Sequence, residues 1–318
     1  MSSERSSAFS RPATRLTTWS MSADARHERV SPPLLAAAVR NDMLRAFLRP
    51  GPGDRVIDLG CGSGRSLVWN HDLGARAVGV DVSPHFAEEA RRDADLALGD
   101  LRRLPFADGS FDKGYALDVF EHLSREGLNE VLAEISRVLA PGGRLFAYSH
   151  VRKNSRLALG LRVVNRLAAR LERAGALDLT QEHLRKSDHL NPLADIPDLE
   201  RTVAAAGFRI DRIRYYTPLV GGFVENILVR GAEQWLARRA ARHAPRGTRE
   251  AGPGVPDRAA LARGVRMEAK ERISRGGAVL ATLRVLTWLM KLDVVLFGRV
   301  RSGPFFVLLV KSGCGAGR

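Results

Sequence analysis

The chain has 318 residues, 45% of them hydrophobic, and its formal net charge is +15 at pH 7. This length exceeds one ordinary α/β domain and is ample for a large core. Two cysteines, Cys61 and Cys314, provide no disulfide framework, and the first residues lack the apolar core of a signal peptide. Composition therefore argues against a secreted, disulfide-stabilised protein and favours a cytoplasmic one.

The N-terminal region divides into two parts. Residues 1–30 are rich in Ser, Arg and Thr, and we expect them to be disordered. Pro32-Pro33 and the apolar run 34–39 then predict a helix that leads into the folded domain.

The most informative segment is 55–64, Arg-Val-Ile-Asp-Leu-Gly-Cys-Gly-Ser-Gly. An apolar run of strand character breaks into glycines at alternate positions, where the backbone can take positive φ and approach a ligand closely. The segment predicts the first β-turn-α unit of a doubly wound sheet, whose carboxyl edge binds nucleotide-like ligands. Its pattern is G-x-G-x-G, which differs from the dinucleotide pattern G-x-G-x-x-G.

Further strands and turns follow in chain order. A strand over 76–81 ends in Asp81, a residue able to accept hydrogen bonds from ribose hydroxyls, and Ser83-Pro84 is typical of a helix start. A third strand ends at Asp100 and a fourth covers 111–118. A helix over 124–139 then leads through a Pro-Gly-Gly turn into a fifth strand, 145–149.

Together these motifs resemble the class I S-adenosylmethionine (SAM) dependent methyltransferases. The shared patterns are D-L-G-C-G-x-G at 58–64, L-P-F-x-D-x-S-F-D at 104–112 and L-x-P-G-G at 139–143. The resemblance is strong over 36–150, loose over 176–216 and weak over 304–311. It implies an α/β fold with a doubly wound, seven-stranded Rossmann-like sheet whose last strand is antiparallel.

The resemblance also implies a set of SAM-binding residues. The glycine loop, with Asp58 beneath it, would lie under the methionine part, and Asp81 would hold the ribose hydroxyls. Asp100 and the Leu101 backbone amide would bind adenine, and Asp118 would lie near the methyl group. Carboxylates suit a cationic donor and repel a pyrophosphate, although any single Asp can instead cap a strand or turn. The implied set is Asp58, Gly60, Cys61, Gly62, Gly64, Asp81, Asp100, Leu101 and Asp118.

The histidines are the candidates for a general base. His122 is the candidate catalytic residue, and His150, His183 and His189 are further candidates. Each of them can equally be an ordinary buried or surface imidazole. Asp118, Glu121 and His122 resemble the E-x-x-E-H constellation of some metal-assisted O-methyltransferases, with Asp in place of the first Glu. Many members of the broad group carry Glu-His without a metal, so no metal is expected.

The unusual region lies between strand six, 208–216, and the last strand, 304–311. We expect a methyltransferase domain formed by 31–216 and 304–313, with a helical insertion over 217–303 that contains a Pro- and Gly-rich linker at 245–256. Residues 230–301 hold 16 Lys and Arg against six Asp and Glu.

The apolar run near the end of this insertion, 278–298, is interrupted by charged residues. Arg284, Lys291 and Asp293 make it a poor membrane span. A helix within 276–299 could lie in an anionic membrane interface, or it could be a lid that packs its apolar side onto the catalytic domain. We favour a combined role, in which the helix is a lid that admits hydrophobic substrates from a bilayer.

The sequence therefore predicts a SAM-dependent methyltransferase acting at oxygen or carbon of a small, hydrophobic or lipid-like acceptor. It would be cytoplasmic, with a peripheral position on the inner face of the membrane as a variant. The first alternative is an RNA methyltransferase, suggested by the positive charge. It is disfavoured because the basic insertion lacks interleaved aromatic residues and no Asn/Asp-Pro-Pro-aromatic sequence follows the fourth strand. The second alternative is a non-catalytic interaction protein with a SAM fold.

Overall fold

The structure is a computed structural model that describes residues 30–152, 159–174, 189–216, 220–229, 231–232, 277–301 and 303–312. The predicted disordered segment, the linker at 245–256 and His183 lie outside these residues.

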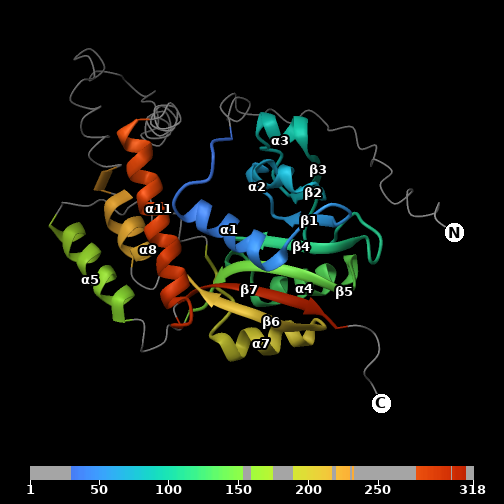
Figure 1. Ribbon diagram of the computed structural model, residues 1–318. Coiled ribbons are helices and arrows are strands. Elements are labelled where there is room, and N and C mark those ends of the chain that lie inside the picture. The colour runs from blue at the N-terminus through green and yellow to red at the C-terminus, as the bar shows by residue number, and fades with distance from the viewer. Residues whose placement is uncertain are drawn as a thin grey trace, which may run out of the picture.

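A seven-stranded sheet forms the middle of the molecule, in the order β3-β2-β1-β4-β5-β7-β6 (Figure 1). Strand β7 is antiparallel to both of its neighbours, while the strands from β3 to β5 run parallel. This arrangement confirms the predicted fold class. The strands are β1 (Arg55–Leu59), β2 (Arg76–Asp81), β3 (Asp95–Leu98), β4 (Phe111–Leu117), β5 (Leu139–His150), β6 (Phe208–Tyr215) and β7 (Pro304–Lys311).

Helices cover both faces of the sheet. They are α1 (Ala36–Leu48), α2 (Arg65–Asn70), α3 (Glu88–Asp93), α4 (Arg125–Val138), α5 (Leu159–Arg173), α7 (Ile196–Ala205), α8 (Val220–Phe223) and α11 (Ala278–Phe297). Short 3-10 turns η3 (His71–Leu73) and η4 (Phe120–His122) and a π-helical segment η5 (Val224–Val229) complete the described elements.

Two hydrophobic cores lie on opposite faces of the sheet. One face packs against α4 and α7, through residues such as Val131, Ile135 and Val203. The other packs against α1 and α11, where Met290 and Val294 of α11 join Phe47 of α1. Helix α11 therefore belongs to the same three-layer body as the sheet, although it comes from the predicted insertion.

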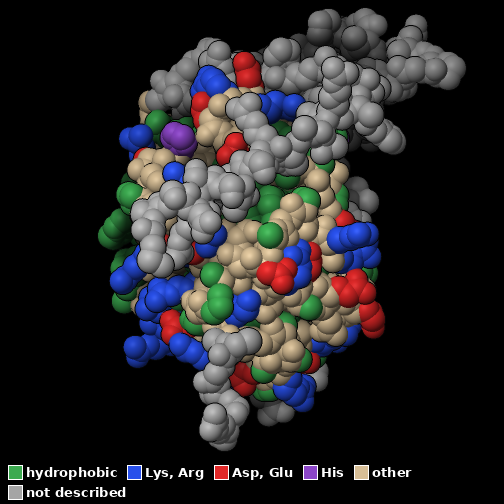
Figure 2. Space-filling model, turned by 90° about the vertical axis from the view of Figure 1, so that its right-hand side faces the viewer, with side chains coloured by type: hydrophobic (Ala, Val, Ile, Leu, Met, Phe, Trp, Pro, Cys, Tyr) green, Lys and Arg blue, Asp and Glu red, His purple; other side chains and the backbone are tan. Residues whose placement is uncertain are grey.

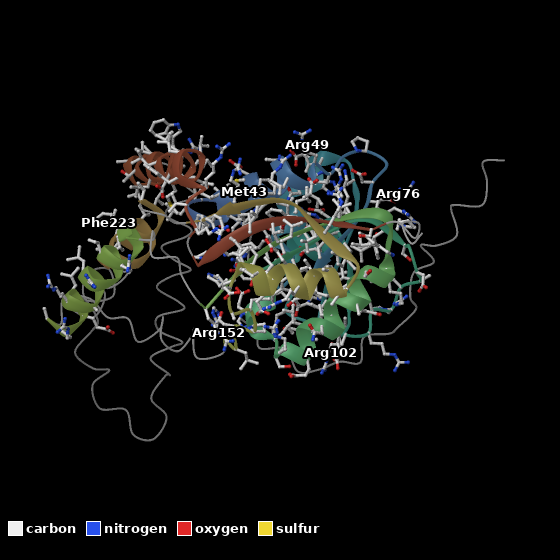
Figure 3. All side chains as sticks on the ribbon, turned by 90° about the horizontal axis from the view of Figure 1, so that it is seen from below. Met43, Arg49, Arg76, Arg102, Arg152 and Phe223 are labelled. Carbon is white, nitrogen blue, oxygen red and sulfur yellow. The ribbon has the colours of Figure 1, made fainter. Side chains whose placement is uncertain are left out.

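Helices α5, α8 and α11 lie together at one end of the molecule, the left end of Figure 1. In a view from below, Phe223 at the end of α8 lies beside α5 and away from the sheet (Figure 3). Among the described residues, no helix has the length and hydropathy needed to cross a bilayer.

Several predicted boundaries were wrong. Ser83-Pro84 starts no helix, since α3 begins only at Glu88. The Oδ1 of Asp81 accepts the Ser83 amide and so holds this segment in a bend, while its Oδ2 accepts the Gly62 amide of the glycine loop. Strand β3 ends at Leu98 rather than Asp100, and β5 begins at Leu139, directly after α4, because a bulge near the Pro-Gly-Gly turn still allows pairing with β4.

Candidate functional site

The glycine loop connects β1 to α2 at the carboxyl edge of the sheet. Gly60, Gly62 and Gly64 have φ values of +72°, +55° and +78°. A Cβ on Gly60 would lie 2.7 Å from a methyl of Val119, and one on Gly64 would lie 2.6 Å from the Cβ of Ala90. The loop therefore needs glycine both for its backbone conformation and for its close approach to neighbouring segments.

Asp58 lies in β1 directly beneath this loop and is only 2% exposed. Its Oδ2 has no hydrogen-bond partner within the described part of the chain. Burial raises the pKa of this carboxyl to about 8, against a hydrogen bond from Tyr115 that lowers it, and the nearby Asp81 raises it further. An orphaned buried carboxyl under a glycine cradle fits a ligand that brings a positive charge, as the ammonium and sulfonium groups of SAM do.

Asp81 ends β2 and is tied to the glycine loop. Its Oδ2 accepts a hydrogen bond of 2.7 Å from the Gly62 amide, and its Oδ1 accepts one of 2.8 Å from the Ser83 amide. These two bonds fix the carboxylate at the edge of the sheet, with further lone pairs available for ribose hydroxyls. Cys61, inside the loop, has its thiol pKa strongly raised by burial and by Asp58 and Asp81, so this thiol stays protonated.

Asp100 and Leu101 follow β3 at the same edge. The Arg102 side chain pairs with Asp100 at 2.6 Å, and the pKa of Asp100 is lowered by hydrogen bonds from the Arg102 side chain and amide. Leu101 is 9% exposed and joins the core beside α4. Asp100 thus already has a cation partner, and the adenine-binding role of both residues stays a prediction of the resemblance.

Asp118 follows β4 and has the left-handed φ of +56°, which is uncommon for a residue other than glycine. Its carboxylate pairs with Arg40 of α1, and the Arg40 guanidinium also lies 5.0 Å from the centre of the Tyr148 ring. Sequence reasoning did not find Arg40, because no motif marks a single arginine on a covering helix.

A second polar cluster lies just beyond Asp118, at the ends of β4 and β5. Glu121 is buried, and its Oε2 accepts a hydrogen bond of 2.9 Å from the Ser149 hydroxyl. Its Oε1 lies 3.5 Å from His150 Nδ1. Burial raises the pKa of Glu121, but the adjacent His150 and the Ser149 hydroxyl outweigh this and hold it below its usual range.

His122 and His189 complete this cluster. The centres of the two imidazole rings are 4.7 Å apart, and the His189 ring is 6.2 Å from that of His150. The structure therefore brings together three of the four candidate histidines around Glu121, the residue that the sequence placed beside His122 in the E-x-x-E-H constellation. Helix α4 instead begins at Arg125 and is capped by the Ser124 hydroxyl.

Comparison with known proteins agrees with this geometry. Residues 57–147 match the family model described as a methyltransferase domain. A demethylmenaquinone methyltransferase of Mycobacterium sp. (strain KMS) is 33% identical over 186 residues, which are 56% of this chain and 76% of the relative.

Other relatives match over shorter regions. An O-methyltransferase of Pyrenophora dematioidea is 36% identical over 110 residues, 31% of this chain and 40% of the relative. A sterol 4-C-methyltransferase of Caenorhabditis elegans is 31% identical over 107 residues, 31% of each chain. The chain thus spans less than half the length of these two relatives.

Among solved structures, phosphoethanolamine N-methyltransferase 2 of Haemonchus contortus, in complex with SAM, has the same fold. Its TM-score is 0.51 at 16% sequence identity, and the match covers 88% of this chain and 54% of that one. Motifs, sheet order and relatives agree, and the chain belongs to the class I SAM-dependent methyltransferases.

Proposed function

We propose that the protein transfers the methyl group of SAM to a small, hydrophobic or lipid-like acceptor at oxygen or carbon. The observation that carries this proposal is the exposure of apolar side chains on α11: Met290 and Val294 pack inward beside Thr287 and Asp293, while six other large apolar side chains of the helix stay open to solvent. Relatives named for sterols and for demethylmenaquinone add support, since both names denote apolar molecules.

The inner side of α11 makes specific polar contacts. The Thr287 hydroxyl accepts a hydrogen bond of 2.8 Å from the Leu35 amide, and Lys291 pairs with Asp42 at 2.6 Å. Asp293, which is 2% exposed, accepts hydrogen bonds from the amides of Val220 and Gly221. These contacts hold the helix against α1 and α8.

The outer side of the same helix is apolar. Trp288 is 60% exposed and Val295 is 79% exposed, and four more large apolar side chains of α11 are also open to solvent: Val279, Val285, Leu296 and Phe297. Exposed large apolar side chains gathered on one helix are typical of an interaction site. Arg284 is exposed on the same helix, so the surface combines apolar and basic groups, as interfacial helices do.

We further propose that this surface contacts an anionic membrane, from which the acceptor enters, and that the protein is cytoplasmic and peripheral on the inner face. On the face seen in Figure 2, at the end of the molecule away from α11, Lys and Arg side chains lie among Asp and Glu side chains.

The residues of the site have simple tasks in this reaction. Bound SAM supplies an electrophilic methyl group on a sulfonium, and its leaving group departs neutral and needs no proton. The protein therefore mainly aligns the acceptor with the methyl group, an effect that contributes several kcal/mol, and where necessary it removes a proton. The first task belongs to the glycine loop with Asp58 and Asp81, and the second to the histidine cluster.

The acceptor is tested by incubating the protein with methyl-labelled SAM and separate lipid, RNA and small-metabolite extracts. We expect label in the organic phase of the lipid extract, and none with an Asp81→Ala variant. Label in the RNA fraction alone would replace the proposal with the RNA methyltransferase alternative, and no label together with no SAM binding would favour an interaction protein.

Membrane contact is tested by flotation with vesicles that contain anionic lipid. Trp288→Glu should reduce the floated fraction severalfold, whereas Ala204→Glu, an exposed change of equal charge on α7 at the opposite face of the sheet, should not. Equal flotation of both variants and the unmodified protein would overturn the membrane proposal.

A further inference from the structure

The cluster around Glu121 contains an unsatisfied carboxylate oxygen. The Glu121 side chain has no exposed surface, and its Oε1 makes no hydrogen bond with any described residue. A buried carboxylate oxygen without a partner costs free energy comparable to a lost charged hydrogen bond. Its neighbour His150 has Nδ1 3.5 Å away, makes no hydrogen bond to it and is charged only when protonated, so a bound cation would satisfy this oxygen more fully.

Two imidazoles lie on the open side of this carboxylate. One ligand atom from each of Glu121, His122 and His189 can be chosen so that all three lie within 4.8 Å of one another. His122 is exposed and His189 is half-buried, so the pair lies where solvent reaches the buried carboxylate. The arrangement is held by the backbone, because the Asn191 amide donates a hydrogen bond of 2.9 Å to the Glu121 carbonyl and so ties the His189 segment to η4.

The distances between the possible ligand atoms of Glu121, His122 and His189 are close to those in a metal centre. Metal bonds of about 2.0–2.2 Å put adjacent ligand atoms about 3.0–3.5 Å apart, so small rotations of the two imidazoles would close the set. Two nitrogens and one carboxylate oxygen suit a transition-metal dication better than magnesium or calcium, which prefer oxygen ligands.

We propose that Glu121, His122 and His189 bind one transition-metal dication, with coordination positions left open beside Asp118. Asp118 is not a ligand in this set, since its carboxylate pairs with Arg40. The site thus differs from the constellation suggested by sequence, because His189, 67 residues after His122, takes the place of the first acid, Asp118.

The open positions give the site a role in acceptor choice. This role rests on the proposed methyl transfer. The dication would bind an oxygen of the acceptor and lower the pKa of that hydroxyl group, which favours O-methylation over C-methylation. His150 would then be a positioning residue, since it contacts the carboxylate ligand.

The experiment measures metal binding by the full chain without any acceptor. Calorimetry with Zn²⁺, and the visible absorption of bound Co²⁺, should report one site per chain. His122→Ala and His189→Ala should each weaken binding at least tenfold, and Glu121→Gln, which keeps the shape of the side chain, should do the same. His71→Ala is the matched control, because His71 is exposed between α2 and β2 at the opposite edge of the sheet.

Thermal melting of each variant separates loss of the site from loss of the fold. Equal Zn²⁺ affinity in His71→Ala, His122→Ala and His189→Ala would overturn the proposal, and so would unchanged affinity in Glu121→Gln. Failure of methyl transfer to lipid acceptors would contradict the proposed function but would not change these Zn²⁺-binding results, so the two proposals are tested independently.

Discussion

Asp58 makes the stability of this protein depend on pH in a defined direction. Its pKa is about 8 in the folded protein against an ordinary value of 3.8. Below pH 4 the carboxyl is protonated in both states and imposes no penalty. As pH rises toward 8, the unfolded chain releases this proton while the folded protein retains it, so the folded state loses stability.

The size of the effect follows from the shift. Each pH unit in this window lowers the free energy of unfolding by about 1.4 kcal/mol, so the loss at pH 7 is on the order of 4 kcal/mol. Asp58→Asn removes the titration while keeping the shape of the side chain. The variant should therefore gain stability over the unmodified protein as pH rises from about 4.5 to about 7.5, at about 1.4 kcal/mol per unit.

The assay is urea unfolding of both proteins at four pH values between 5 and 9, without SAM. The difference between them isolates Asp58 together with Cys61 and Tyr115, whose pKa values Asp58 raises, since the remaining titrations are shared. Asp211→Asn, an exposed change on β6, controls for loss of a carboxylate in general. If the difference between Asp58→Asn and the unmodified protein stays constant across this range, the carboxyl is not held protonated and the reasoning is wrong.

Three further substitutions test other parts of the structure. Tyr115→Phe removes the hydrogen bond that lowers the Asp58 pKa, so the pH window of the stability loss should extend to higher pH in the same urea series. Gly60→Ala should lower the free energy of unfolding more than Gly62→Ala, since both have positive φ but only the first meets a neighbour at 2.7 Å; the reverse order in chemical denaturation would contradict this. Asp293→Ala should lower the free energy of unfolding by about 1–3 kcal/mol, because it leaves the amides of Val220 and Gly221 without their acceptor. The control Asp42→Asn, at the exposed ion pair with Lys291, should lower it by under about 1 kcal/mol. Equal shifts of the melting temperature in the two variants would contradict this prediction.

The fold was predictable because its signals are local. The glycine loop after β1 and the alternation of β6 each lie within one short segment, and β7 was placed at its observed bounds, Pro304–Lys311. Asp58, Asp81 and Asp118 could be predicted to lie together, because each is at or near the carboxyl end of a strand and the parallel topology brings these ends to one edge of the sheet.

The rest depended on contacts between distant segments. Arg40 reaches Asp118 across 78 positions, and His189 is brought to His122 by a hydrogen bond between Asn191 and Glu121. Neither contact has a sequence pattern. The strand boundary at Asp100 was misplaced: pairing with β2 ends at Leu98, and Asp100 lies in the following turn, where its Oδ1 accepts the Arg102 amide.

Helix α11 illustrates how composition alone misleads about orientation. Its apolar residues outnumber its polar ones, so hydrophobic burial alone would place most of them inward. Thr287 and Asp293 instead face α1 and α8, because each satisfies backbone amides that would otherwise be buried without a partner. Helix α1 contacts α11 through Leu35 and Asp42, and it also carries Arg40 to Asp118. The exposed apolar side chains of α11 and the edge of the candidate SAM site therefore share one supporting helix, α1. Arg40→Ala would break the pair with Asp118 and leave the pair of Asp42 with Lys291 in place, so it should change SAM binding without changing membrane flotation.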